Sequence, residues 1–268
     1  MLEKIYKGTN QDNWCDLCAS TDWDVCTIAR FANHAGLGLH WRKRQEPEGE
    51  VLLAYGDKPD FVAYVLSGVV RIVKILSNGR EEVVDLLYPG DFLSAPFHTP
   101  SDFAFEAATD VELLAMDAGE FETATGASRD LRNALIRLRE REVSLARQRI
   151  LLFAAQRTLE RVAIYLSIRH HRRARLLNQR VQDRAIISLM GRKDLASYLG
   201  TTIETVSRHL HHLSRIGVIR IVDNRRFEIL DPDRLLYISG VSRDDIRLFW
   251  QGCGRLVEIR NEIAALRQ

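Results

Sequence analysis

The pattern of apolar residues changes abruptly near Ser128, and this change constrains the fold more than any other feature of the sequence. Before it, short apolar runs alternate with turn residues, among them Asn78-Gly79. The runs cover residues 51–54, 61–66, 69–76, 83–88, 103–108 and 111–116. An Asn-Gly pair between two such runs is a strong hairpin signal, so this half predicts an antiparallel β-roll or jelly roll. A plain β-sandwich without a sensory role fits the same pattern.

Beyond Ser128, leucines recur every seven residues on a segment that contains neither Pro nor Gly. They are Leu131, Leu138, Leu145, Leu152 and Leu159. A sustained seven-residue apolar repeat is typical of a coiled-coil seam. We therefore expect residues 128–166 to form one long helix that pairs two copies of the chain in a homodimer. A single long core helix is the alternative.

The charges are distributed unevenly along the chain, although the formal net charge is only +2. Residues 1–127 carry 10 Lys and Arg against 21 Asp and Glu, whereas residues 128–230 carry 22 against 9. A basic second half favours a polyanionic partner, and double-stranded DNA is the simplest one. No apolar run approaches the length of about 18 residues that a membrane span needs, and no signal peptide is recognised. We expect a soluble cytoplasmic protein without a membrane partner.

The segment from Met190 to Leu210 predicts two helices joined at Gly200-Thr201, which is helix-turn-helix spacing. Its second helix would enter the major groove of DNA, and its exposed face would present Thr202, Glu204, Thr205, Ser207 and Arg208. Residues 216–220 and 227–229 predict a β-hairpin wing that turns near Asp223-Asn224. The nearby His209, His211 and His212 do not converge on a helix, so we expect phosphate contact or solvation rather than a metal site. A generic helical hairpin is the alternative.

Three of the four cysteines cluster near the N-terminus as C-x2-C-x7-C. They are Cys15, Cys18 and Cys26, and Cys253 lies near the other end. Clustered thiols in a cytosolic chain favour metal or redox chemistry over a structural disulfide. Three thiolates from one loop make a partial cage for zinc or an iron–sulfur cluster. Three free thiols in an N-terminal arm are the alternative.

The order of β-roll, long helix and winged helix-turn-helix resembles the Crp/Fnr superfamily of bacterial transcription regulators. The residues that carry this resemblance are Gly56-Asp57, residues 61–68, Pro89-Gly90-Asp91-Phe92, Ala108-Thr109-Asp110 and residues 199–208. It spans residues 13–236 and, through Glu204-x-x-Ser207-Arg208, is similar to the Fnr branch that includes FnrL and FixK. The resemblance implies an α+β fold and a protein that is not an enzyme.

We therefore divide the chain into five parts. They are a cysteine-containing arm (1–30), a β-roll sensor domain (31–127), a dimerisation helix (128–166), a winged helix-turn-helix domain (167–236) and a helical C-terminal extension (237–268).

The resemblance also implies a DNA target and a protein partner. Members of the Fnr branch bind a palindrome of the type TTGAT-N4-ATCAA. Carried over residue by residue, Glu204 would accept a hydrogen bond from a cytosine amino group and Arg208 would donate to guanine O6 and N7. Ser207 would assist at the base edges or the backbone, and RNA polymerase would be the protein partner.

Oxygen-sensing members hold a [4Fe–4S] cluster with three N-terminal cysteines and a fourth in the β-roll. The N-terminal spacing matches, but Leu114 stands at the position expected for the fourth ligand, and leucine cannot coordinate iron. Three explanations remain open. A carboxylate, Asp110 or Glu112, supplies the ligand; Cys253 completes the set; or no stable cluster forms and the cysteines bind another metal or none.

A cyclic nucleotide is not expected as the effector, because no Lys or Arg occurs from Glu81 through Ser128 to pair with its phosphate. A cupin-type enzyme would need several metal ligands inside the roll, where only His98 occurs. We therefore predict an Fnr-type regulator controlled by oxygen or redox state. One rival is a cluster-free regulator controlled by abundance or another ligand. The other is a thiol oxidoreductase built on Cys15 and Cys18, although the flanking sequence lacks a thioredoxin-like βαβ context.

Overall fold

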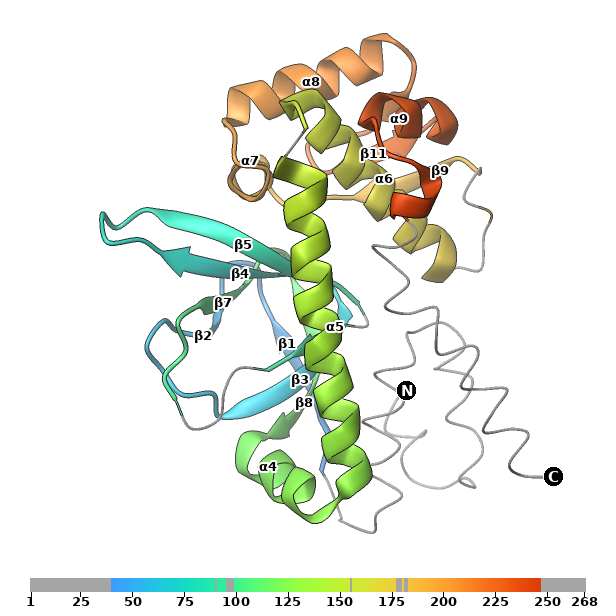
Figure 1. The fold of residues 1–268 in the computed structure, drawn as a ribbon. Helices are drawn as coiled ribbons and strands as arrows, with labels where there is room; N and C mark the ends of the chain where they lie inside the picture. The colour runs from blue at the N-terminus through green and yellow to red at the C-terminus, as the bar shows by residue number, and fades with distance from the viewer. Residues whose placement is uncertain are drawn as a thin grey trace, which may run out of the picture.

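The structure is a computed structural model that describes residues 40–89, 91–94, 99–154, 156–176, 180 and 183–246. A β-roll of two sheets is followed by a long helix and a smaller helical and stranded part (Figure 1). The strands of the roll are β1 (Arg42–Glu46), β2 (Val51–Leu53), β3 (Phe61–Ser67), β4 (Val70–Ile75), β5 (Glu81–Leu87), β6 (Phe92–Leu93), β7 (Ala104–Ala107) and β8 (Val111–Asp117). The later elements are α4 (Ala118–Ala127), α5 (Arg129–Ala154), α6 (Thr158–Leu176), β9 (Ala185–Ser188), α7 (Arg192–Tyr198), α8 (Ile203–Arg215), β10 (Ile219–Ile221), β11 (Arg226–Ile229) and α9 (Pro232–Ser239).

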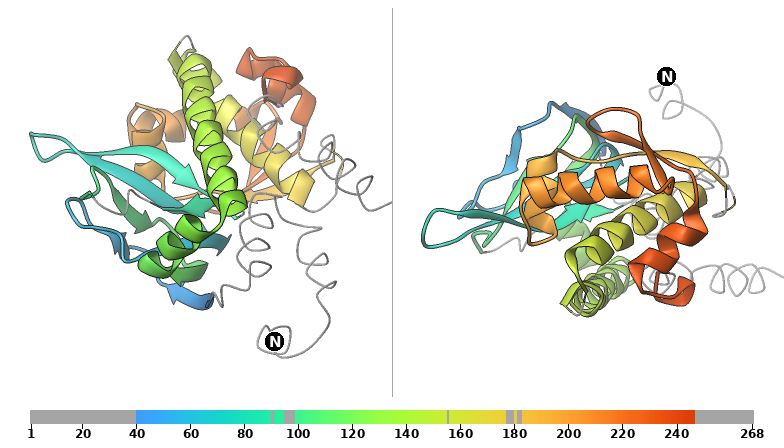
Figure 2. Two further views of the ribbon diagram at one scale, coloured as in Figure 1. Left: turned by 60° about the horizontal axis from the view of Figure 1, so that its bottom comes forward. Right: turned by 90° about the horizontal axis from the view of Figure 1, so that it is seen from above.

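The β-roll confirms the antiparallel fold expected from the sequence. One sheet has the strand order β1-β8-β3-β6 and the other β2-β7-β4-β5, and every pairing in both is antiparallel. Strands β4 and β5 form the predicted hairpin, which extends away from the body (Figure 2) and turns at Gly79 with φ 78°. Apolar side chains such as Phe61, Val65, Phe105 and Leu113 fill the space between the sheets.

The outer face of the first sheet is covered by α4 and the beginning of α5. Val62, Tyr64 and Phe92 alternate along their strands with the inner residues and pack against Phe121 and Leu131. Tyr64 and Phe92 stack in tilted geometry at 4.7 Å between ring centroids. This packing attaches the N-terminal half of α5 to the roll.

The predicted single helix over residues 128–166 is corrected, because α5 ends at Ala154 and α6 begins at Thr158. The Glu160 side chain accepts a hydrogen bond from the backbone N–H of Arg157 at 2.7 Å and thereby caps the start of the second helix. Val162 and Leu166 of α6 are fully buried in the core of the C-terminal part. Leu159 thus continues the seven-residue repeat in sequence but belongs to a different helix.

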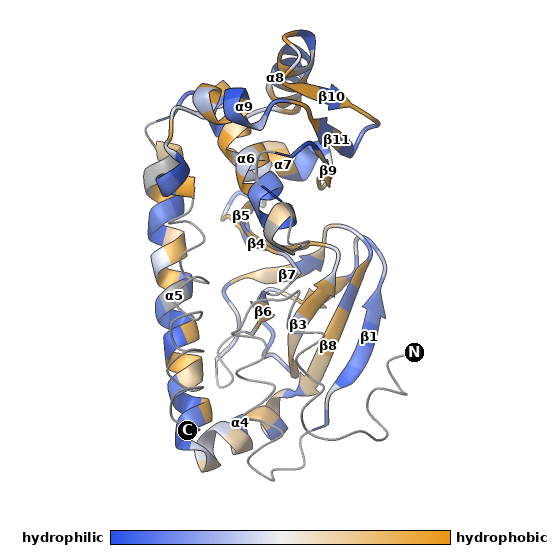
Figure 3. Cartoon of the chain, turned by 90° about the vertical axis from the view of Figure 1, so that its right-hand side faces the viewer, coloured by the Kyte–Doolittle hydropathy of each residue, from blue (hydrophilic) through white to orange (hydrophobic). Residues whose placement is uncertain are grey.

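The leucine seam is also corrected, because Leu131 is 0% and Leu138 7% exposed within a single chain. Both pack against the outer face of the β-roll, so they have no surface to offer to a second copy. Leu145 is half-buried, and nothing is described of the Leu152 side chain. Among the large apolar side chains of α5 whose burial is described, the exposed ones are instead Ile136, Val143 and Ile150, which keep the same spacing in a different register. Apolar and hydrophilic bands alternate along this helix (Figure 3).

A second core joins the roll to the C-terminal part. Val83, Leu86 and Tyr88 at the β5 side of the roll pack with α6, α7 and α8 in one apolar cluster. Helix α7 lies on β5, where the Ser197 hydroxyl accepts from the Val83 N–H at 2.8 Å and donates to Glu82 at 3.1 Å.

Two arginines add ionic contacts to this junction. Arg71 of β4 pairs with Asp194 of α7 and with Glu106 of β7. Arg149 of α5 pairs with Asp85 of β5. Burial is the largest single influence on the Arg149 guanidinium and opposes its charge, but Asp85 and Tyr198 together raise the pKa of Arg149 above its usual value. These contacts connect the roll, the long helix and the helix-turn-helix.

The predicted helical extension lies mostly beyond residue 246 and so outside the described residues. Within the described part of the chain, no helix has the length and apolar character that crossing a bilayer requires.

Candidate nucleic-acid interface

Helices α7 and α8 form the helix pair predicted from the sequence. The turn between them contains Gly200 with φ 62°, a left-handed conformation that glycine adopts without strain. Thr202 caps α8 by accepting a hydrogen bond from the Thr205 N–H at 3.3 Å. Leu195 of α7 and Val206 and Leu210 of α8 are fully buried and hold the pair together. The opposite face of α8 remains open to solvent.

The predicted DNA-contacting residues share this open face. Thr202, Glu204 and Arg208 are exposed, whereas Thr205 and Ser207 are half-buried. Arg208 donates to the Thr205 hydroxyl at 3.1 Å, and this hydroxyl also lies 3.1 Å from the Thr202 hydroxyl. The guanidinium of Arg208 is therefore positioned before any ligand arrives.

Glu204 is a hydrogen-bond acceptor near neutral pH. Its own backbone N–H and then the Thr202 hydroxyl lower the pKa of the Glu204 carboxyl below its usual value. An ionised carboxylate one turn before a guanidinium presents an acceptor and a forked donor on one helix face. These are the groups that distinguish base edges in the major groove.

Ser207 has a partner that the sequence did not reveal. Arg192, the first residue of α7, donates from Nη1 to the Ser207 Oγ at 3.2 Å. The two residues are fifteen positions apart and meet only because α7 packs across α8. In the sequence, the basic residue Arg192 at the start of the first helix was the one feature that could have indicated this contact.

The wing is confirmed and is larger than predicted. Strands β10 and β11 pair as expected, and β9 adds a third strand beside β11. In the turn, the carboxylate of Asp223 accepts from the Arg225 and Arg226 N–H groups, which with the Arg226 side chain lower the pKa of Asp223 to about 2. Arg225 also forms an ion pair with Glu48 of the roll.

The three histidines of α8 form no metal site. No group of three or more His, Cys, Asp or Glu that could hold a metal ion occurs among the described residues. Burial, and then the nearby Arg208 and His212, lower the pKa of His209.

The predicted cysteine ligands Cys15, Cys18, Cys26 and Cys253 lie outside the described residues. The two carboxylates proposed to replace the missing cysteine are already engaged. Asp110 accepts from the Glu48 N–H at 2.9 Å, and Glu112 pairs with Lys43.

Leu114 pairs across the sheet with Tyr64 and packs in an apolar cluster that includes Trp41. The described residues therefore place an apolar side chain at the expected ligand position, and the two carboxylates nearest to it in the sequence already have polar partners.

Comparison with known proteins agrees with this arrangement. Residues 43–126 match the family model of a cyclic nucleotide-binding domain, and residues 160–238 match that of a Crp-like helix-turn-helix domain. The transcriptional activator protein FnrL of Cereibacter sphaeroides is 31% identical over 86% of this chain and 93% of its own length. The nitrogen fixation regulation protein FixK of Bradyrhizobium diazoefficiens is 31% identical over 83% of this chain and 92% of its own.

The solved structure of FixK2 from Bradyrhizobium japonicum covers 76% of this chain and 100% of that chain, with a TM-score of 0.67 and 26% identity. The two curated relatives are regulators rather than enzymes, and regulators of this kind bind DNA and dimerise. Because the similarity extends over both the roll and the helix-turn-helix, this chain belongs to the Crp/Fnr family of transcription regulators, in its Fnr/FixK branch, and is not an enzyme.

Proposed function

We propose that this chain is a cytoplasmic, homodimeric activator or repressor that reads a TTGAT-N4-ATCAA palindrome and acts on RNA polymerase. The observation that carries the proposal is the pairing of an ionised Glu204 with a positioned Arg208 on the open face of α8. Glu204 accepts from a cytosine N4 amino group, and Arg208 donates to O6 and N7 of a guanine. A G·C pair in each half-site satisfies both residues.

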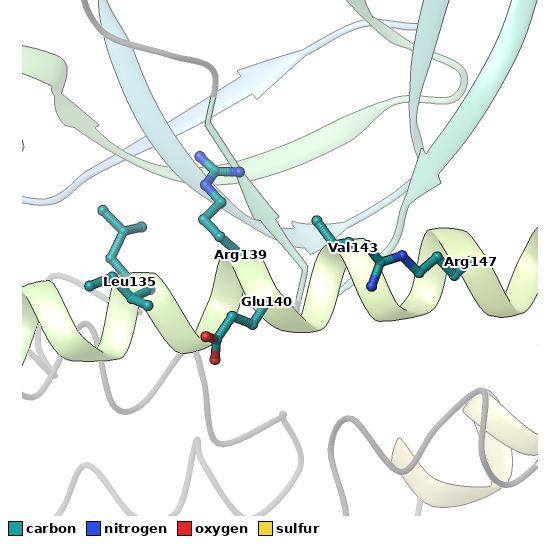
Figure 4. Close-up of a pocket in the computed structure, with 6 residues that line it drawn as sticks. Leu135, Arg139, Glu140, Val143 and Arg147 are labelled. Atoms are coloured by element: carbon teal, nitrogen blue, oxygen red, sulfur yellow. The ribbon is translucent and has the colours of Figure 1, made fainter.

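Dimerisation supports reading of a palindrome, because a two-fold symmetric protein places two recognition helices on two related half-sites. We propose that the second copy packs on the exposed stripe of Ile136, Val143 and Ile150, which are 50%, 47% and 65% exposed. An open pocket of about 490 Å³ lies on this stretch of α5 and is also lined by Leu135, Arg139, Glu140 and Arg147 (Figure 4). A seven-residue apolar repeat with charged flanks is the pattern of a helix–helix seam.

The seam is tested by Val143→Asp, with Ser144→Asp as the matched control. Val143 lies in the stripe, whereas Ser144 is the exposed residue beside it. A carboxylate buried between two helices lacks a partner, so we expect Val143→Asp to halve the mass measured by light scattering. The control should remain dimeric. Equal masses for both variants would contradict the proposed seam.

DNA reading is tested by fluorescence anisotropy with the palindrome and with duplexes altered at single base pairs. Arg208→Ala should weaken binding about 5- to 150-fold, since a good bidentate contact contributes about 1–3 kcal/mol, and should abolish the preference for G·C at one position. Arg215→Ala, on the exposed end of the same helix, should weaken binding without changing base preference. Loss of base preference in both variants would contradict the assignment.

The effector is proposed from the sequence of the N-terminal arm. We infer that Cys15, Cys18 and Cys26 make the protein responsive to oxygen or redox state, with an iron–sulfur cluster as the group held. The fourth ligand would come from Cys253, or from Asp110 or Glu112 if the contacts of these carboxylates with Glu48 and Lys43 rearrange.

A cyclic nucleotide is not proposed as the effector. The space between the sheets is filled by apolar side chains, and Arg71 is paired with Glu106 and Asp194. A buried phosphate without a cation is costly.

The effector is tested on protein purified without oxygen, by visible spectrum and iron and sulfide assay before and after air. A broad absorption that bleaches in air and is absent in Cys18→Ala supports the cluster. A colourless, iron-free protein that binds the palindrome in air would refute oxygen sensing and leave a cluster-free regulator.

A further inference from the structure

The side chain of Arg192 is a half-buried cation with no neutralising carboxylate in the described part of the chain. Its guanidinium lies 5.4 Å from the ring centroid of Phe227, which is fully buried in β11. Its Nε is buried without a hydrogen-bond partner, and no carboxylate pairs with it among the described residues. Burial lowers the pKa of Arg192. Burying an unpaired guanidinium costs free energy, so the position of Arg192 is better explained by a role in binding than by a contribution to stability.

The contact with Ser207 has a definite direction. Arginine has five N–H donors and no acceptor, so the Ser207 oxygen must accept from Nη1 of Arg192. The single hydroxyl hydrogen of Ser207 is then directed away from the guanidinium. Within the described part of the chain, that hydrogen has no acceptor on a backbone carbonyl or side chain.

Ser207 stands beside Arg208 and three residues after Glu204, on the face that reads DNA. A serine that can either donate or accept distinguishes base edges poorly. The Ser207 oxygen keeps one lone pair after it accepts from Arg192, but the adjacent positive charge disfavours a second donor there, so the hydroxyl hydrogen is the group offered to a base. Thymine O4, guanine O6 and N7, and adenine N7 are the acceptors of the major groove that this hydrogen can reach, whereas the amino groups of cytosine and adenine are disfavoured beside the guanidinium.

We propose that Arg192 is a positioning residue for DNA specificity: it fixes the Ser207 hydroxyl as a hydrogen-bond donor and so sets which base Ser207 reads. The proposal rests on the DNA-binding function proposed above and adds a residue outside the recognition helix to it. The competing role for Arg192 is a direct contact to a DNA phosphate, which would carry no base information.

The test compares affinities for the palindrome and for every single-base-pair change in its half-site. The proteins are wild type, Arg192→Met, Ser207→Ala and the double variant. Lys193→Met, which removes the neighbouring exposed cation, is the control. Removing one well-directed hydrogen bond should reduce base discrimination about three- to tenfold at one position.

We expect Arg192→Met to lose discrimination at the same base pair as Ser207→Ala, and the double variant to lose no more than either. Arg192→Lys, which keeps a charged donor, should restore much of the discrimination. Lys193→Met should weaken all duplexes alike. Melting temperatures near that of wild type would show that the variants are folded.

The proposal is overturned if Arg192→Met weakens every duplex equally, lowers the salt dependence by about one phosphate contact and adds to the effect of Ser207→Ala. That result would assign Arg192 to a phosphate. Failure of the wild-type protein to prefer the palindrome over unrelated DNA would instead refute the proposed function itself. The two failures are therefore distinguishable in one set of titrations.

Discussion

Gly68 sits at a close approach between two turns of the β-roll, and its substitution should be among the most destabilising changes in the roll. It connects β3 to β4 with φ +84°. A Cβ at this position would lie 2.2 Å from the carbonyl oxygen of Asp110 and 2.9 Å from the Cα of Val111. The turns are also joined by a hydrogen bond of 2.9 Å from the Val69 N–H to the Thr109 hydroxyl.

Gly56 provides a matched control, because its φ is +86° and an added Cβ would meet nothing within 4 Å. Alanine in the left-handed region costs about 1–2 kcal/mol at either position. At Gly68 the overlap is with backbone, which no rotamer change relieves, and overpacking adds about 1–3 kcal/mol. We expect Gly68→Ala to lower the free energy of unfolding by about 2–5 kcal/mol.

Thermal unfolding followed by circular dichroism measures this difference. For a chain of this size, 1 kcal/mol corresponds to about 2–4 °C in Tm. Gly68→Ala should therefore lower Tm by roughly 5–15 °C, and Gly56→Ala by only a few degrees. Equal decreases in the two variants would show that backbone conformation alone, and not the contact with Asp110, determines the cost.

Three further changes test other parts of the structure. Arg149→Leu leaves Asp85 without its partner at the junction and should cost about 3 kcal/mol in urea unfolding, whereas Arg137→Leu at an exposed position of the same helix should be nearly neutral. Burial lowers the pKa of His171, so the unfolded chain binds more protons than the folded one, and stability falls as the pH drops below about 6.5. His171→Gln should reduce the decrease of the urea midpoint between about pH 8 and pH 5. An unchanged dependence of the urea midpoint on pH would contradict this prediction. Thr202→Ala removes the cap of α8 and should cost about 1 kcal/mol, whereas Thr202→Ser should retain the stability in the same assay.

The strands that the sequence predicted are those with apolar runs bounded by turn residues. Strand β1 (Arg42–Glu46) was missed because its residues are mostly charged and show no apolar pattern. It lies at the edge of its sheet, where backbone hydrogen bonds to β8 hold it in the extended conformation. Strand β9 was missed because four residues are too few to show a period. The helix pair α7–α8 was predicted because its spacing, its glycine turn and its N-cap are all local.

Relationships between distant residues were the part that the sequence did not reveal. The leucine repeat correctly indicates an apolar face on α5, but a period does not say what covers that face. Leu131 and Leu138 are covered by the chain's own roll, and a different set of residues stays exposed. The contact between Arg192 and Ser207 depends in the same way on how two helices cross.

Strand β5 is an outer strand of its sheet, and such strands offer unpaired backbone groups to other chains. In this molecule the Val83 N–H is paired with Ser197, and helix α7 lies over the apolar residues beside it. The helix-turn-helix part therefore covers an edge of the β-roll that would otherwise be open to pairing with another chain. A β-roll expressed alone would expose the unpaired backbone groups of β5 together with the apolar residues that α7 now covers. It should therefore associate through these sheet edges into oligomers that the full chain does not form.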